Sequence, residues 1–190
     1  MTKLILTDVD DTILRFSEPF QDWIIARGLK PNGNLREQYS IEKWLGVPRT
    51  QAVALIEEFS TSPEMINQPP EECALEVLPK LYEEGWRFVA ITACGVDEDF
   101  RQQRWTTLNE TFGFPWEAVH TVGLRLPKTD VLKLYPPSIW VEDNFEHAVD
   151  GAAMGHRAFI MHRAYNADDE HPEVIRVPSW RELHECLKLV

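Results

Sequence analysis

Acidic residues spaced for metal or phosphoryl chemistry occur at two places far apart in the chain. Asp8 and Asp10 follow the apolar segment 3–7 and are two residues apart, so both point to one side of an extended chain. Glu142 and Asp143 close a second apolar segment that begins at Ser138. Carboxylate oxygens are the ligands that a hard dication such as Mg²⁺ prefers. The four acids therefore form a candidate metal site if the fold brings the two segments together.

The same residue types suit phosphoryl transfer. A carboxylate can attack phosphorus and form an aspartyl-phosphate that water then hydrolyses. A second carboxylate can protonate the leaving alcohol and later deprotonate the attacking water. Hydroxyl and ammonium groups stabilise charge on the phosphoryl oxygens, and Thr12, Thr92 and Lys128 follow or precede predicted strands where they could do so.

The chain alternates between strand and helix patterns, which predicts a parallel, doubly wound α/β sheet. Such sheets bind ligands at the carboxyl ends of their strands, where the acids above lie. Helix-stop glycines and apolar periodicity place the elements. We expect strands at 3–7, 87–91, 118–122, 138–142 and 157–161, and helices at 17–28, 41–45, 50–59, 71–84, 97–112 and 144–154, with a terminal helix opened by 179–182.

One segment breaks the alternation. Residues 15–70 show helical periodicity without a convincing strand, with Ser17 as the expected N-cap of the first helix. We predict an α/β core of residues 1–14 and 71–190, with 15–70 as a small helical insertion lying over the sheet. Pro79 lies inside the pattern 71–84, so we expect a kink there or a helix start near Leu78.

Composition excludes several classes of protein. The chain has 190 residues, 31 acids and 19 Lys and Arg residues, giving a net charge of −12. That charge argues against a nucleic-acid polymer as partner but allows a small anion in a locally positive pocket. No apolar run approaches the ~20 residues of a membrane helix. Three scattered cysteines favour neither disulfides nor a zinc site, so we expect a cytoplasmic protein.

The motifs together resemble the haloacid dehalogenase (HAD) superfamily of phosphohydrolases. The resemblance rests on the strand followed by Asp8-Val-Asp10-Asp-Thr12, the strand ending at Thr92, then Lys128, and the strand ending in Glu142-Asp143. It covers essentially the whole chain, and the insertion lies where the family carries its C1 cap. The resemblance implies that Asp8 is the nucleophile and a metal ligand, and that Asp10 is the general acid/base and binds the metal through its backbone carbonyl. It also implies that Thr92 and Ala93 bind the phosphate. Lys128 would neutralise the phosphoryl group and orient Asp8, and Asp143 would be a further Mg²⁺ ligand.

Two residues depart from the family pattern. Asp11 replaces the usual glycine of the first loop, which could alter the loop conformation. Glu142 stands where a second aspartate is commoner, which leaves open whether it binds the metal directly. Lys133 also competes with Lys128 for the catalytic position, and we prefer Lys128 because it opens the helix and follows Pro127.

Within the superfamily, the 5′(3′)-deoxyribonucleotidases show the nearest likeness, through chain length, cap size, Lys128-Thr129 and Ser179-Trp180. The insertion is rich in aromatic residues, which could stack on a base or form the core of the cap. The candidates are Phe16, Phe20, Trp23, Trp44 and Phe59. We favour a cap core for any single one of them, and Phe16 as the pocket residue because it lies just past the catalytic loop.

These features predict a Mg²⁺-dependent phosphomonoester hydrolase that acts on a small phosphorylated substrate, with a nucleoside monophosphate favoured. A phosphatase for another metabolite such as a phosphosugar, a catalytically idle HAD-fold binding protein, and transfer to an acceptor other than water remain as alternatives. The sequence decides neither the base, the sugar, the 5′ or 3′ position nor the oligomeric state.

Overall fold

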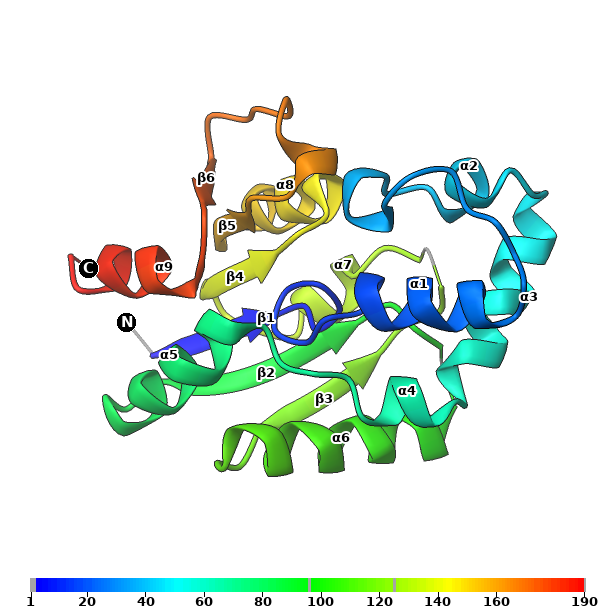
Figure 1. Cartoon of the computed structure of the whole chain (residues 1–190). Coiled ribbons are helices and arrows are strands. Elements are labelled where there is room, and N and C mark those ends of the chain that lie inside the picture. The colour runs from blue at the N-terminus through cyan, green and yellow to red at the C-terminus, as the bar shows by residue number, and fades with distance from the viewer. Residues whose placement is uncertain (1–2, 96, 125, 190) are drawn as a thin grey trace.

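A parallel sheet forms the centre of the molecule (Figure 1). The computed structural model describes residues 3–95, 97–124 and 126–189, and in these ranges six strands pair in the order β3-β2-β1-β4-β5-β6, each neighbouring pair parallel. The predicted α/β class and parallel sheet are thus confirmed. The strands are β1 (Leu4–Thr7), β2 (Arg87–Thr92), β3 (Ala118–Thr121), β4 (Ile139–Glu142), β5 (Arg157–Met161) and β6 (Val174–Val177).

The strand order explains how distant motifs meet. β1 lies between β2 and β4, with Thr7 level with Ala90 on one side and Val141 on the other. Because the strands run parallel, their carboxyl ends share one edge of the sheet. The residues that follow β1, β2 and β4 are therefore neighbours in space.

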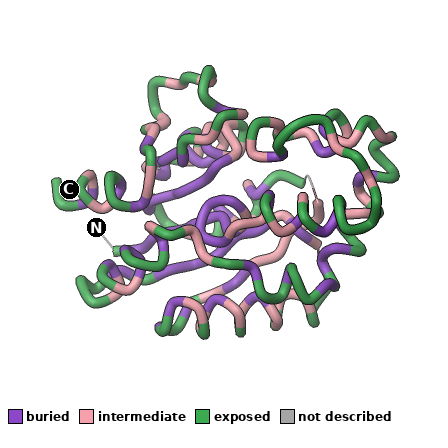
Figure 2. Tube along the Cα trace, in the orientation of Figure 1, coloured by how far each residue is buried: buried purple, intermediate pink, exposed green. Residues whose placement is uncertain are grey.

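Helices cover both faces of the sheet. On one face α5 (Glu72–Glu83), α6 (Glu98–Phe112) and α9 (Trp180–Leu187) pack on a large apolar cluster, and on the other α7 (Thr129–Leu132) and α8 (Phe145–Ala153) pack around Trp140 and Leu6. β1, β2, β4 and β5 are buried almost throughout, as expected for strands covered on both sides (Figure 2).

The segment between β1 and α5 forms a group of helices beyond the carboxyl ends of the strands (Figure 1). It contains α1 (Ser17–Ala26), the 3₁₀ turn η1 (Leu35–Glu37), α2 (Ile41–Leu45), α3 (Arg49–Ser60) and α4 (Pro63–Ile66). These helices supply most of a third apolar cluster, which also includes Cys94 beyond the end of β2. We refer to residues 15–70 as the helical cap.

Several elements differ from the sequence-based expectation. β6 and the short helix α4 were not expected, because β6 is only partly buried and the four residues of α4 carry too little periodicity to be recognised. The helix expected to begin at Lys128 is present as the short α7. α5 begins at Glu72 and runs through Pro79, so the alternative start near Leu78 is wrong. Ser17 is the first helical residue of α1, not its N-cap, and the capping bonds come from Asp11 instead.

Among the described segments, no helix combines the length and the hydropathy needed to span a bilayer.

Candidate active site

A tight loop after β1 positions the first pair of acids. The backbone N–H of Asp8 donates to the carbonyl of Val141 in β4 at 2.9 Å, which fixes the end of β1 beside the end of β4. The amides of Thr12, Ile13 and Leu14 all donate to the carbonyl of Val9. The chain therefore turns sharply after Asp8 and Asp10 and leaves them at the edge of the sheet.

Three buried acids meet at this edge. Carboxylate oxygens of Asp8, Glu142 and Asp143 lie within 4.8 Å of one another, although Asp8 and Asp143 are 135 residues apart in sequence. The hydroxyl of Thr12 lies between two of them, 3.1 Å from Oδ2 of Asp8 and 3.4 Å from Oδ1 of Asp143.

Lys128, at the start of α7, is the cation of this cluster. Its Nζ contacts Oδ1 of Asp8 and lies 2.5 Å from Oε1 of Glu142. The other oxygen of Glu142 accepts the backbone N–H groups of Asp143 at 2.8 Å and Asn144 at 2.9 Å. The competing residue Lys133 is exposed and pairs with Asp130, away from the acids.

Burial and like charges raise the proton affinity of two of these acids. Burial raises the pKa of Asp8 to about 7, with Glu142 and Asp10 adding to the effect and Lys128 opposing it. Burial and the neighbouring Glu142 and Asp8 raise the pKa of Asp143 well above its ordinary value. Lys128 alone therefore does not neutralise the charge of the three acids.

The donor set fits a divalent cation of the magnesium type. Three carboxylates whose oxygens lie within 4.8 Å of one another supply hard ligands that one ion could share. Burial and the neighbouring carboxylates raise the pKa values of Asp8 and Asp143, and a bound dication would stabilise their ionised forms. Glu142 accepts Lys128 and two backbone N–H groups, whereas Asp8 accepts Lys128 and the Thr12 hydroxyl. Asp143 accepts the hydroxyls of Thr12 and Tyr165.

Asp10 is not part of the three-acid cluster and has a different set of contacts. Its Oδ1 accepts Nη2 of Arg104 at 2.6 Å and Nε2 of Gln68 at 3.2 Å, and its Oδ2 accepts the hydroxyl of Thr92 at 3.2 Å. Thr92 ends β2, and Ala93 follows it at the wall of the cavity. The structure thus places Asp10, Thr92 and Ala93 together, beside Asp8.

Asp11, which replaces the usual glycine of the first loop, has a left-handed backbone conformation. Its φ is +55°, the region that favours glycine, so the loop keeps the conformation that a glycine would adopt. Its carboxylate accepts the backbone N–H groups of Phe16 at 2.9 Å and Ser17 at 3.0 Å, and also the Ser17 hydroxyl. These bonds at the start of α1 compensate for the strained backbone.

Some residues of the site were not identified from the sequence. The Tyr165 hydroxyl contacts Oδ2 of Asp143, and Arg104 and Gln68 hold Asp10. The sequence contains an indication for Arg104, because this arginine lies on the apolar stripe of α6, four residues before Leu108. An arginine in an apolar stripe needs a buried partner. Tyr165 and Gln68 lie outside regular periodicity and carried no comparable signal.

A cavity of about 360 Å³ opens over these groups, between the strand ends and the helical cap. Asp8, Asp10, Lys128 and Asp143 form its floor, and Phe16 and Tyr39 are among the cap residues that line it. Its volume is within the range of small-molecule sites.

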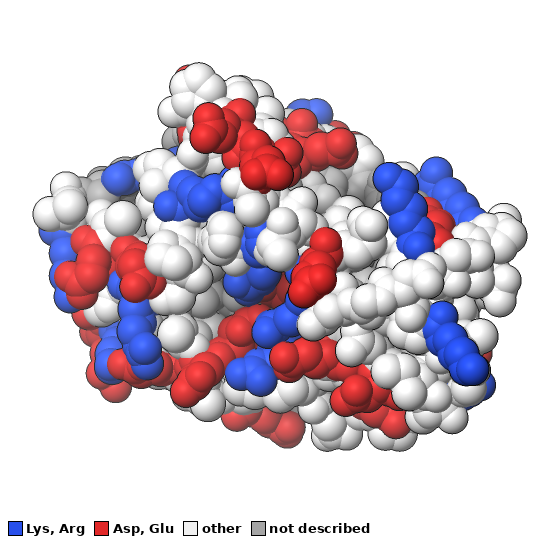
Figure 3. All heavy atoms as spheres, turned by 45° about the horizontal axis from the view of Figure 1, so that its top comes forward, with Lys and Arg blue, Asp and Glu red and all other residues white. Residues whose placement is uncertain are grey.

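Figure 3 shows acidic and basic side chains interleaved across the middle of one face, without a broad field of one sign.

No protein-family model and no curated protein sequence matches the chain. Solved structures, in contrast, superpose on the chain over almost its whole length. A predicted phosphatase from Clostridium acetobutylicum superposes with a TM-score of 0.71 at 14% identity, covering 100% of both chains. The L-2-haloacid dehalogenase of Xanthobacter autotrophicus superposes with a TM-score of 0.62 at 14% identity, covering 99% of both chains.

The chain has the haloacid dehalogenase fold. A third structure with the HAD fold is the D,D-heptose 1,7-bisphosphate phosphatase of B. bronchiseptica, complexed with magnesium and phosphate, which superposes with a TM-score of 0.61 at 13% identity over 98% of both chains. At these identities the likeness establishes the fold and its connectivity. Proteins that share a fold differ in function, and the reaction depends on the residues that this chain places at its strand ends.

Proposed function

We propose that the protein is a Mg²⁺-dependent phosphomonoester hydrolase that works through an aspartyl-phosphate on Asp8. The observation that carries the proposal is the position of Asp8. It lines the cavity, one of its oxygens contacts Lys128, and its carboxylate lies close enough to those of Asp143 and Glu142 to share an ion with them. The HAD phosphatase bound to magnesium and phosphate is consistent with this chemistry.

The proposed residues divide the reaction between them. An oxygen of Asp8 attacks phosphorus while Lys128 and the Thr92–Ala93 segment hold the phosphoryl oxygens, and Asp10 gives a proton to the leaving alcohol. Water then attacks the intermediate, Asp10 takes its proton, and Asp8 is released. Asp8, Asp143 and the backbone carbonyl of Asp10 would hold Mg²⁺, which would supply positive charge against the phosphoryl oxygens. The cap would exclude bulk water from the cavity.

The substrate class that we favour is a nucleoside monophosphate. Of the five aromatic residues considered in the cap, Phe20, Trp23, Trp44 and Phe59 are buried in its apolar cluster. Phe16 is only partly buried and lines the cavity, backed by Phe20 at a ring-centroid distance of 5.2 Å. An aromatic ring that lines the cavity and is supported by a second ring behind it is suited to stacking on a base.

The first test is hydrolysis of 4-nitrophenyl phosphate with and without Mg²⁺, followed by a panel of nucleoside 5′- and 3′-monophosphates and phosphosugars. The proposal expects activity that EDTA removes and Mg²⁺ restores. Complete inactivity on every phosphate with Mg²⁺ present would favour an idle HAD-fold binding protein. Activity confined to phosphosugars would overturn only the nucleotide preference.

Phe16→Leu tests the stacking role. Loss of a base-stacking ring should raise KM for a nucleoside monophosphate about 10-fold. Ribose 5-phosphate has no base and serves as the matched control, with unchanged KM. An equal change for both substrates would argue that Phe16 supports the cap and not the base.

A further inference from the structure

Arg104 is a buried cation outside the group of residues assigned to the reaction above. It lies on the inner face of α6, and its side chain is 3% exposed. Burying a guanidinium costs several kcal/mol unless charge and hydrogen bonds compensate for it. In the described part of the chain, the ion pair recorded for Arg104 is with Asp10, Nη2 to Oδ1 at 2.6 Å.

Gln68 links Arg104 to the same carboxylate. The residue is buried in the segment that leads from α4 back to the core. Its Nε2 donates to Oδ1 of Asp10 at 3.2 Å, and its Oε1 accepts Nη1 of Arg104. Each of the three side chains therefore contacts the other two, and the amide and guanidinium fix the plane of the carboxylate.

The two oxygens of Asp10 are consequently unequal. Oδ1 accepts both N–H donors, from Arg104 and Gln68. Oδ2 faces the hydroxyl of Thr92, which ends β2 beside the proposed phosphate position. A proton on Oδ1 would oppose two N–H groups aimed at that atom, whereas Oδ2 faces a hydroxyl that can rotate to become an acceptor.

We propose that Arg104 and Gln68 are positioning residues that fix Asp10 so that Oδ2 alone exchanges protons with the substrate. The inference rests on the proposed phosphatase reaction. In the first half, the bond from phosphorus to the leaving oxygen breaks, the bond to Asp8 forms, and the proton of Oδ2 moves to the leaving oxygen. In the second half, water attacks phosphorus, its proton moves to Oδ2, and the bond to Asp8 breaks.

The experiment compares substrates that differ in their need for a proton. 4-Nitrophenolate leaves readily without one, whereas an alkyl phosphate requires it. In Arg104→Met we expect kcat/KM to fall about 10- to 100-fold for the alkyl phosphate and less than about 3-fold for 4-nitrophenyl phosphate. Asp10→Asn supplies the reference pattern. Equal losses on both substrates, or no loss, would overturn the proposal.

Gln68→Met decides the question if Arg104→Met does not fold. It removes one donor from Oδ1 and should give the same selective loss at smaller size. Arg101→Met is the matched control, since Arg101 lies one turn earlier on α6 at the surface and pairs with Glu98. It should leave both substrates unchanged. A wild-type protein inactive on all phosphates would contradict the proposed function itself, and thus differs from a failure of the Arg104 inference.

Discussion

Nζ of Lys128 lies 2.5 Å from Oε1 of Glu142, at the junction between α7 and the end of β4. Both side chains are almost fully buried, and Glu142 is anchored through its other oxygen by two backbone N–H groups. Glu142 therefore holds Lys128 against Asp8. This contact gives a physical role to the glutamate that departs from the commoner Asp-Asp pattern.

Lys128→Met should destabilise the protein in a pH-dependent way. The variant leaves the buried carboxylates without their cation, which costs about 3 kcal/mol where the carboxylates are ionised. At pH 5 they can take up protons instead, so the loss should be smaller there than at pH 8. Urea unfolding in EDTA at both pH values measures the difference. A loss independent of pH would contradict the assigned charges. The exposed Lys133→Met variant is the control and should change little.

Magnesium should stabilise the protein more at pH 8 than at pH 5. The pKa of Asp8 is raised by burial from 3.8 to about 7, so the folded state binds more protons than the unfolded state between these values. Without metal, this contribution to stability is lost as the pH rises toward 7. Mg²⁺ binds the ionised form and should add about 2.7 kcal/mol at a concentration 100 times its Kd.

Thermal unfolding with and without Mg²⁺ at the two pH values tests this prediction. Asp143→Asn should abolish most of the shift at pH 8. An equal shift at both pH values, or a shift that survives Asp143→Asn, would place the ion elsewhere.

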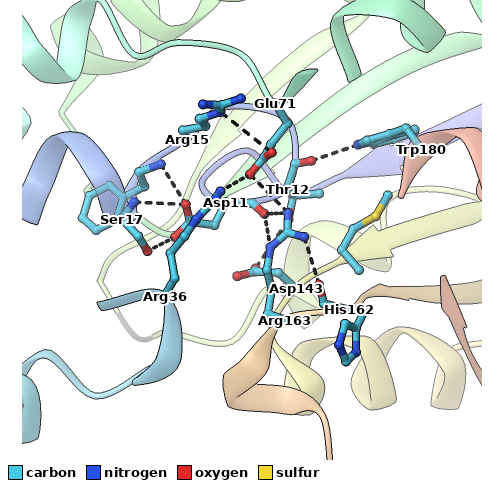
Figure 4. Close-up of polar contacts among 12 residues, drawn as sticks. Asp11, Thr12, Arg15, Ser17, Arg36, Glu71, Asp143, His162, Arg163 and Trp180 are labelled. Atoms are coloured by element: carbon cyan, nitrogen blue, oxygen red, sulfur yellow. Dashed lines mark hydrogen bonds and ion pairs between the residues drawn. The ribbon is translucent and has the colours of Figure 1, made fainter. Parts of the chain in front are cut away.

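A network of charged residues joins the helical cap to the core (Figure 4). Glu71, at the return from the cap, lies 2.7 Å from Arg36 of the cap and 3.3 Å from Arg163 of the core. Arg163 also donates through Nε to the backbone carbonyl of Asp11 at 3.1 Å. The network thus connects the cap to the loop that carries Asp8 and Asp10.

The pair Arg36–Glu71 should show a measurable coupling because Glu71 is 18% exposed. A double-mutant cycle with Arg36→Met and Glu71→Gln should give about 0.5–1 kcal/mol. The exposed pair Arg27–Glu58 is the matched control and should give less than about 0.3 kcal/mol. Equal couplings for the two pairs would contradict a specific role for Glu71.

Gly151 should not tolerate a methyl group. A Cβ at this position would lie 2.2 Å from Cδ1 of Trp140, the buried residue of β4 whose indole donates to the carbonyl of His147. Gly151→Ala should therefore cost about 1–3 kcal/mol despite the better helix propensity of alanine. In a Trp140→Phe background the same change should cost less than half as much. Urea unfolding of the four proteins gives the comparison.

The parallel sheet was predictable because buried strands and helix-stop glycines repeat along the chain. The position of Lys128 relative to Lys133 followed from its place at the start of a helix. The partners of Asp10 were not predictable, since Gln68 returns from the cap and Arg104 approaches from α6 only after the fold is complete. Asp11 shows a different limit. The sequence indicated that an aspartate in place of the glycine could alter the loop, but Asp11 adopts the left-handed conformation, and its bonds to α1 were not predictable.

Asp8→Asn should lower kcat at least about 10³-fold. The residue is buried and its carboxyl is of nearly the same size as the amide, so the variant should keep the circular dichroism spectrum of the wild type. Retained activity would contradict the role of Asp8 as nucleophile, whatever other substitutions show.

The phosphoryl acceptor itself can be observed. The wild-type protein, mixed with Mg²⁺ and 4-nitrophenyl phosphate and quenched in acid within the first turnover, is reduced with borohydride and digested for mass spectrometry. Borohydride converts an aspartyl-phosphate to homoserine, and we expect this change at Asp8 in the wild type and not in Asp8→Asn. Hydrolysis that proceeds with Asp8 unmodified, or with the change at another residue, would contradict it.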